Sequence, residues 1–107
     1  MTRLISTFLA VVTPLVLVGC LSMDSHQNFM NTLQLSVGRS LSNPYLYTNR
    51  NRNLYVATKP LPNGNVEEEF KGGRGPTCRV FFEIDNKAEK VVSWRYEGSD
   101  EDCAITP

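Results

Sequence analysis

The chain begins with a nearly unbroken apolar run. Most positions from Leu4 to Val18 are apolar, Arg3 stands in front of them, and a polar stretch follows Cys20. A membrane-spanning helix needs about 20 apolar residues, so this shorter run behind a basic residue is typical of a secretory signal. The pattern therefore predicts that residues 1–19 form a signal peptide, which is removed from the mature chain.

A helical period opens the mature chain. Phe29, Leu33 and Val37 recur at a spacing of four residues, which places them on one face of a helix. Asp24 stands just before this pattern and begins a capping box. The spacing predicts a helix from Ser25 to Val37.

The clearest strand signal is the alternation of apolar and polar residues from Cys78 to Asp85. A second run, Glu89 to Tyr96, returns after a turn and completes a hairpin. One face of this second run is expected to hold Val92, Trp94 and Tyr96, with Trp94 in the core, and the other face Val91, Ser93 and Arg95.

Two weaker β-favouring runs precede this hairpin. They are Leu54 to Thr58 and Val66 to Lys71, with the turn dipeptide Asn63-Gly64 between them. The stretch from Ser40 to Arg52 has the composition of turns and irregular backbone. The sum is an α+β fold, in which one N-terminal helix packs on a small antiparallel sheet of three to four strands. We expect residues 25–107 to form this single small domain.

The end of the apolar run carries the most specific motif. Leu17-Val18-Gly19-Cys20 resembles the lipobox of bacterial lipoproteins. The resemblance implies that Cys20 receives a diacylglycerol and that residues 20–24 form a lipidated tether. Two or three acyl chains, palmitate among them, anchor a small domain stably in a bilayer. A plain signal peptide or an N-terminal transmembrane anchor is the alternative.

Lipid on Cys20 would leave an even pair of cysteines, Cys78 and Cys103. An oxidising periplasm would join them as a disulfide. A metal or redox site is the less favoured alternative, because the chain has no CxxC motif and only one histidine, His26.

The composition excludes few classes of function, and it does not indicate a charged partner. The 11 basic and 11 acidic residues cancel, so overall charge does not favour nucleic acid. One stretch interleaves aromatic and cationic residues of the types enriched at protein interfaces. Its candidate partner-binding residues are Tyr45, Tyr47, Arg50 and Arg52. The alternative is a solvated loop whose tyrosines pack on the sheet.

Catalytic and metal-binding patterns are weak. His26 is expected to be exposed or to cap the helix, and Glu67 and Glu69 to lie on a solvated strand face. Asp100 to Asp102 lack the spacing of a calcium loop, and Gly72 to Gly75 lack a phosphate-binding pattern. We therefore expect a protein that is not an enzyme and that needs no cofactor and no metal.

The layout of the whole chain resembles a group of small uncharacterised proteobacterial lipoproteins. The similarity rests on the lipobox, the Cys78-Arg79-Val80-Phe81-Phe82 strand, the Val92-Ser93-Trp94-Arg95-Tyr96 strand and the final Cys103. The architecture is also loosely similar to the BamE-like (SmpA/OmlA) outer-membrane lipoproteins, which support assembly of β-barrel proteins. The chain lacks the second helix and the Gly-x-Pro signature of that family.

These resemblances imply a lipoprotein at the periplasmic face of a membrane. Leu21-Ser22 after the lipidated cysteine favours the outer membrane by similarity to enterobacterial sorting. The expected partners are the bilayer, through acylated Cys20, and an unidentified envelope protein. Two alternatives from other classes are open. One is an inhibitor of a muramidase or similar hydrolase that inserts a loop such as Asn49 to Asn53 or Gly72 to Gly75, and the other is a hydrolase that uses Glu67 and Glu69.

Overall fold

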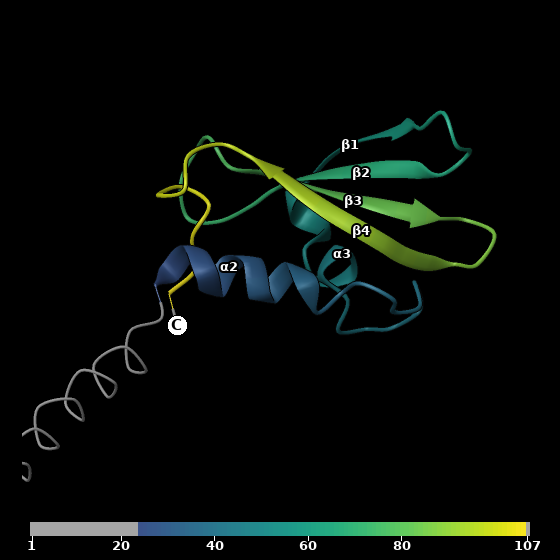
Figure 1. Cartoon of the computed structure of the whole chain (residues 1–107), viewed down its shortest axis with the longest axis horizontal. Helices are drawn as coiled ribbons and strands as arrows, with labels where there is room; N and C mark the ends of the chain where they lie inside the picture. Colours follow the sequence, from purple (N-terminus) through teal and green to yellow (C-terminus); the bar gives the residue numbers. More distant parts are fainter. Residues whose placement is uncertain (1–23, 107) are drawn as a thin grey trace, which may run out of the picture.

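The computed structural model describes residues 24–106 and has the α+β fold that the sequence predicts. A four-stranded antiparallel sheet in the order β1-β2-β3-β4 is covered on one face by helical segments (Figure 1). The strands are β1 (Tyr55–Pro60), β2 (Val66–Lys71), β3 (Arg79–Asp85) and β4 (Lys90–Glu97). The helical segments are α2 (Ser25–Gln34), α3 (Tyr47–Arg50) and the 3-10 turn η2 (Arg52–Leu54). The predicted tether lies outside the described residues except for Asp24, as does the whole predicted signal peptide.

Helix α2 begins where the capping pattern predicts and ends earlier than expected. The Asp24 carboxylate accepts a hydrogen bond from the Gln27 amide at 2.6 Å, which caps the first turn. The prediction that the helix continues to Val37 is wrong. After Gln34 the chain continues in tight turns, with the Ser36 amide bonded to the Leu33 carbonyl at 3.1 Å.

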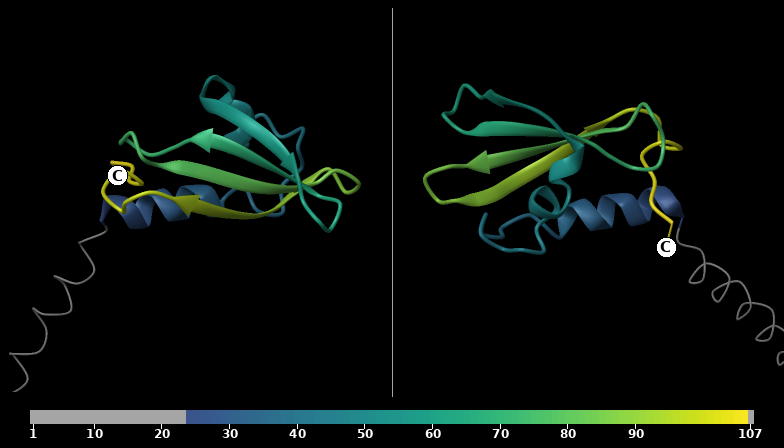
Figure 2. Two further views of the ribbon diagram at one scale, coloured as in Figure 1. Left: turned by 90° about the horizontal axis from the view of Figure 1, so that it is seen from above. Right: turned by 180° about the vertical axis from the view of Figure 1, so that it is seen from behind.

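The segment that follows α2 covers the outer edge of β4. The Gly38 amide donates to the Val91 carbonyl at 2.8 Å, and the Val91 amide donates to the Arg39 carbonyl at 3.2 Å. The stretch expected to be a loop then contains α3 and η2. These short helical segments lie on the same side of the sheet as α2 (Figure 2).

A β-bulge in β4 changes which of its residues face the core. Glu83 pairs with Ser93, but the next pair is Ile84 with Val91, so Val92 has no partner across the strand. As a result Val91 is 1% exposed and belongs to the core, whereas Val92 is 44% exposed. The expectation that Val92 shares the core face with Trp94 is therefore wrong, because the extra residue shifts the alternation by one.

The core lies between the helices and the inner face of the sheet. Phe29 and Leu33 from α2 are fully buried, and so are Phe70 and Phe82 from the central strands. Three aromatic contacts link Phe70, Phe82 and Tyr47, with ring centroids 5.3 to 6.2 Å apart. The inner face of β2 and β3 is thus covered by large apolar side chains from both helical segments.

The predicted disulfide joins Cys78 to Cys103, and this expectation is confirmed. Both cysteines are fully buried. The bond holds the C-terminal segment against the start of β3, and this segment then runs beside the start of α2 (Figure 2). The Ile105 amide donates to the Ser25 carbonyl there at 3.0 Å.

We expect the disulfide to supply a large share of the stability of this small domain. It closes a span of 25 residues, for which loop-closure entropy corresponds to about 3.5 kcal/mol. Reducing the soluble chain that begins at Ser22 should lower the free energy of unfolding in urea by about this amount. A Cys78→Ala/Cys103→Ala variant serves as the control, because reductant should not change its unfolding curve. Equal unfolding midpoints of the parent with and without reductant would contradict the expectation.

Candidate functional site

A groove of about 540 Å³ lies between the end of α2, the connecting segment and α3. Its lining includes Leu35, Arg39, Tyr45, Tyr47, Arg50 and Ile105. No acidic residue lines it. We call it the α2–α3 groove. Its lining also includes Leu46 of the core, and Tyr47 packs against that core.

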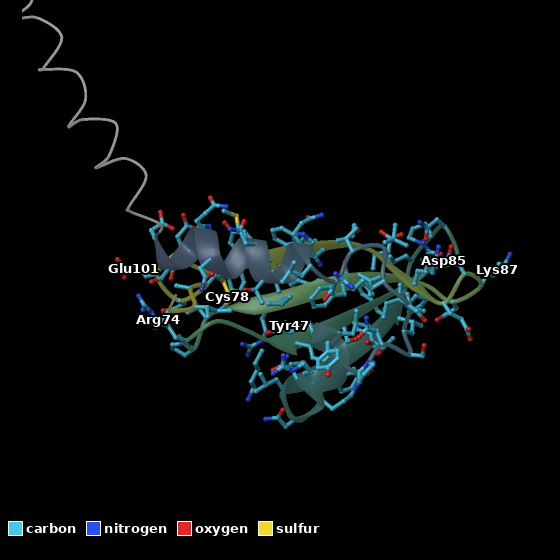
Figure 3. The ribbon with its side chains drawn as sticks, turned by 90° about the horizontal axis from the view of Figure 1, so that it is seen from below. Tyr47, Arg74, Cys78, Asp85, Lys87 and Glu101 are labelled. Atoms are coloured by element: carbon cyan, nitrogen blue, oxygen red, sulfur yellow. A yellow bond between two sulfur atoms is a disulfide. The ribbon has the colours of Figure 1, made fainter. Side chains whose placement is uncertain are left out.

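Tyr47 anchors the floor of the groove. Its ring packs against Phe82 and Phe70, and its amide donates to the buried Ser36 hydroxyl at 3.3 Å. Burial raises the pKa of the Tyr47 hydroxyl above its ordinary value of 10.0. Figure 3 shows Tyr47 between α3 and the sheet. The side chain therefore belongs to both the core and the groove.

Two arginines supply the charge of the groove. The Arg39 side chain donates from Nε to the Leu35 carbonyl at 2.7 Å, which satisfies a carbonyl at the end of α2. Arg50 is the last residue of α3 and is exposed. Neither arginine forms an ion pair with any residue between 24 and 106.

The groove also exposes apolar surface. Leu35 is 65% exposed and Tyr45 is 81% exposed, the two highest values among the large hydrophobic side chains that the structure describes. The Tyr45 amide donates to the Asn43 side chain at 2.8 Å, which fixes the turn that carries the ring. Adjacent apolar and cationic groups in one concave surface are typical of a binding site.

Three of the four candidate partner-binding residues meet in this groove, namely Tyr45, Tyr47 and Arg50. Arg52 lies elsewhere. Its guanidinium bonds to Glu68 at 3.1 Å and lies 5.5 Å from the centre of the Phe70 ring. Sequence reasoning missed Leu35 and Arg39, because no pattern in the sequence indicates that the end of α2 and the segment after it pack beside α3.

The C-terminal segment is tied to α2 by His26. The expectation of an exposed or capping histidine is wrong, because His26 is half-buried and its Nδ1 lies 2.7 Å from the Cys103 carbonyl oxygen. Its Nε2 lies 3.2 Å from the Tyr96 hydroxyl, which donates to Asp100 at 3.1 Å. This cluster joins the helix, β4 and the disulfide-bonded segment.

The outer face of the sheet carries paired charges. The expectation of a solvated Glu67 is wrong: the residue is 8% exposed and receives two hydrogen bonds from Arg95, at 2.9 and 3.0 Å. The Arg95 guanidinium lies 3.8 Å from the centre of the Phe81 ring. Glu69 faces Arg79 at 3.6 Å. Both carboxylates thus have cationic partners on the strands.

Hydrogen bonds from Arg95 lower the pKa of Glu67 from its ordinary value of 4.5, and Glu67 in turn raises the pKa of Arg95. A general acid needs the opposite shift, a carboxyl pKa raised toward neutrality. The contacts of Glu67 therefore do not suit a general acid.

Loop 72–77 is held by Asp102. The Arg74 and Gly75 amides donate to the Asp102 carbonyl, at 3.0 and 3.2 Å, and the Thr77 amide donates to its carboxylate at 3.0 Å. Hydrogen bonds from Thr77 lower the pKa of this carboxyl. No cluster of three potential metal-ligating side chains occurs within residues 24–106.

No protein-family model, curated protein or solved structure matches the chain. The predicted lipidation site, Cys20, lies outside the described residues. Within the part of the chain that the structure describes, no helix has the length and apolar character needed to cross a bilayer.

We expect Glu67→Gln to lower the free energy of unfolding by about 1 kcal/mol at pH 7, since it removes the buried, charged acceptor of a pair whose Arg95 side is exposed to solvent. Because the pKa of Glu67 is lower in the folded chain than its ordinary value of 4.5, the pair stabilises the fold above that pH. Its contribution is lost as the pH falls through the folded pKa. The difference between parent and variant should therefore shrink as acid is added.

Urea unfolding at a series of pH values measures this difference. Glu101→Gln is the matched control, because Glu101 is exposed and makes no ion pair with any described residue. A gap between parent and Glu67→Gln that stays constant from pH 7 to pH 2 would show that the ion pair does not stabilise the fold.

Proposed function

We propose that this chain is a membrane-anchored periplasmic lipoprotein that binds an envelope protein through the α2–α3 groove and has no enzymatic activity. The anchor is Cys20 of the lipobox-like sequence, and the outer membrane is the proposed location. The observation that carries the binding role is the groove itself, where Leu35 and Tyr45 expose apolar surface beside two arginines.

Both edges of the sheet have features that discourage pairing with a strand of another protein, which supports the groove as the binding surface. Edge strand β1 has a register irregularity between Tyr55 and Ala57, and it ends in Lys59 and Pro60. Bulges, lysine and proline are the features by which proteins discourage pairing at a sheet edge. The start of the other edge, β4, is covered by the segment from Gly38 to Leu41.

Affinity purification of palmitate-labelled protein from separated inner and outer membranes tests the proposal. We expect label and a co-purifying protein in the outer-membrane fraction, and neither with Cys20→Ser. Arg50→Ala should reduce the recovered protein severalfold without changing the unfolding midpoint, because its side chain makes no hydrogen bond within residues 24–106. Arg52→Ala is less suitable for this test, since it also removes a hydrogen bond to Glu68 within the fold.

Lys87→Ala provides the matched control for this purification. Lys87 lies in the β3–β4 turn at the far end of the sheet from Arg74 (Figure 3). A partner whose recovery falls equally with Lys87→Ala and Arg50→Ala, or no specific partner at all, would contradict binding through the groove.

A second candidate function, inhibition of a muramidase or similar hydrolase, is supported by the rigidity of loop 72–77. Gly73 has a φ of +62°, and a side chain there would collide with the Asp102 carbonyl oxygen. Exposed Arg74 thus projects from a loop whose shape is fixed before binding. The other loop considered for this role, Asn49 to Asn53, lies largely in α3 and η2.

Direct assays with a muramidase and the soluble chain that begins at Ser22 test this second function. If loop 72–77 inserts into the enzyme, inhibition should fall at least tenfold with Arg74→Ala and should be unchanged with Arg50→Ala. Inhibition that is indifferent to Arg74→Ala would exclude this loop, and a chain that inhibits no hydrolase would exclude the function.

A further inference from the structure

The charge of the α2–α3 groove differs from that of the rest of the molecule. The chain as a whole carries 11 acidic and 11 basic residues. On the sheet the charges are paired between strands, as with Glu67 of β2 and Arg95 of β4, whose guanidinium reaches across Phe81 of β3. The groove instead holds Arg39 and Arg50, and none of its lining residues carries a negative charge. An anionic group that enters the groove would therefore meet cationic side chains and no carboxylate of the lining.

Both arginines are placed by hydrogen bonds of the fold. The carbonyl of Arg39 accepts from the Val91 amide of β4, and its Nε is bonded to the Leu35 carbonyl, which leaves the other guanidinium nitrogens for a ligand. The Arg50 amide is bonded to the Leu46 carbonyl at 3.0 Å, within the short helix. The backbone of both residues is thus held by the fold, and the Arg39 side chain has one bond already, so binding costs less conformational entropy than it would for a mobile loop.

The apolar part of the groove lies beside these cations. Leu35 and Tyr45 present exposed surface, and Ile105 of the disulfide-held C-terminal segment adds a wall. A volume of about 540 Å³ is within the range of sites that enclose a small ligand or a few side chains. The groove can therefore take an apolar side chain next to an anionic group.

We propose that the α2–α3 groove binds a short acidic segment of its partner protein, with a carboxylate at Arg39 and Arg50 and a neighbouring apolar side chain on Leu35 and Tyr45. This inference rests on the proposed function and names the chemistry of the partner. Guanidinium groups bind carboxylates through paired, charge-assisted hydrogen bonds. A concave lining suits an inserted segment of a protein better than the flat surface of a bilayer.

The first step of the test is site-specific photocross-linking in the full-length, membrane-anchored protein. A photoreactive phenylalanine derivative replaces Tyr45 in one variant. A second variant carries it at Val92, which is exposed on β4 and does not line the groove. Mass spectrometry of the product from position 45 should map to a partner segment with aspartate or glutamate within a few residues of an apolar side chain. Position 92 should not yield this segment.

The second step measures affinity. A synthetic peptide of the mapped segment is added to the full-length protein in detergent, beside a peptide with glutamine or asparagine at every acidic position. We expect the neutral peptide to bind at least tenfold more weakly, and Arg50→Gln to weaken the acidic peptide by about tenfold. Arg39→Gln should act in the same direction. Lys87→Gln changes an exposed cation outside the groove and should leave binding unchanged.

The outcomes separate this inference from the proposed function. A mapped segment without acidic residues, or equal affinity of the two peptides, would overturn the acidic-segment inference while leaving a protein partner in the groove. No protein product from position 45 would overturn both. Binding of the Cys20→Ser protein to phosphatidylglycerol vesicles that depends on Arg50 and displaces the peptide would show that the groove contacts lipid headgroups, and it would overturn the inference as well.

Discussion

The bond between Cys78 and Cys103 is the constraint from which much of the rest of the fold follows. It holds the C-terminal segment against the start of β3, and that segment makes three further connections. Asp102 accepts hydrogen bonds from loop 72–77, Cys103 accepts from His26, and Ile105 donates to Ser25 at the start of α2. Without the bond, these polar contacts alone would have to offset the conformational entropy that is lost when a free chain end becomes ordered.

The same segment connects the fold to the groove. Ile105 contacts both the backbone of α2 and the lining of the groove, so one wall of the candidate site is positioned by the disulfide. The floor depends on the Tyr47 ring, which packs on Phe70 and Phe82. Loosening of either contact would widen the groove while the sheet stayed intact. The shape of the groove therefore depends on the disulfide-held segment and on the packing of the Tyr47 ring.

The sequence contains enough information for the strands but not for the groove. Alternation from Cys78 to Asp85 predicts β3 because a half-buried strand leaves a period of two. The bulge at Val92 is not predictable in this way, since an extra residue leaves no mark in the composition of the strand. The groove depends on where α2 ends, and the apolar Val37 extends the helical period past Gln34, although the chain there already turns toward β4.

The position of the groove relative to the proposed anchor sets how a partner approaches. Asp24 is four residues from Cys20, a span of at most about 14 Å when extended, and α2 carries the chain about 15 Å further before Leu35. With Cys20 as the proposed anchor, the groove lies within about 30 Å of the bilayer surface. A partner segment must therefore reach close to the membrane, which favours a partner that is itself membrane-bound, because two proteins confined to one surface meet at a high effective concentration.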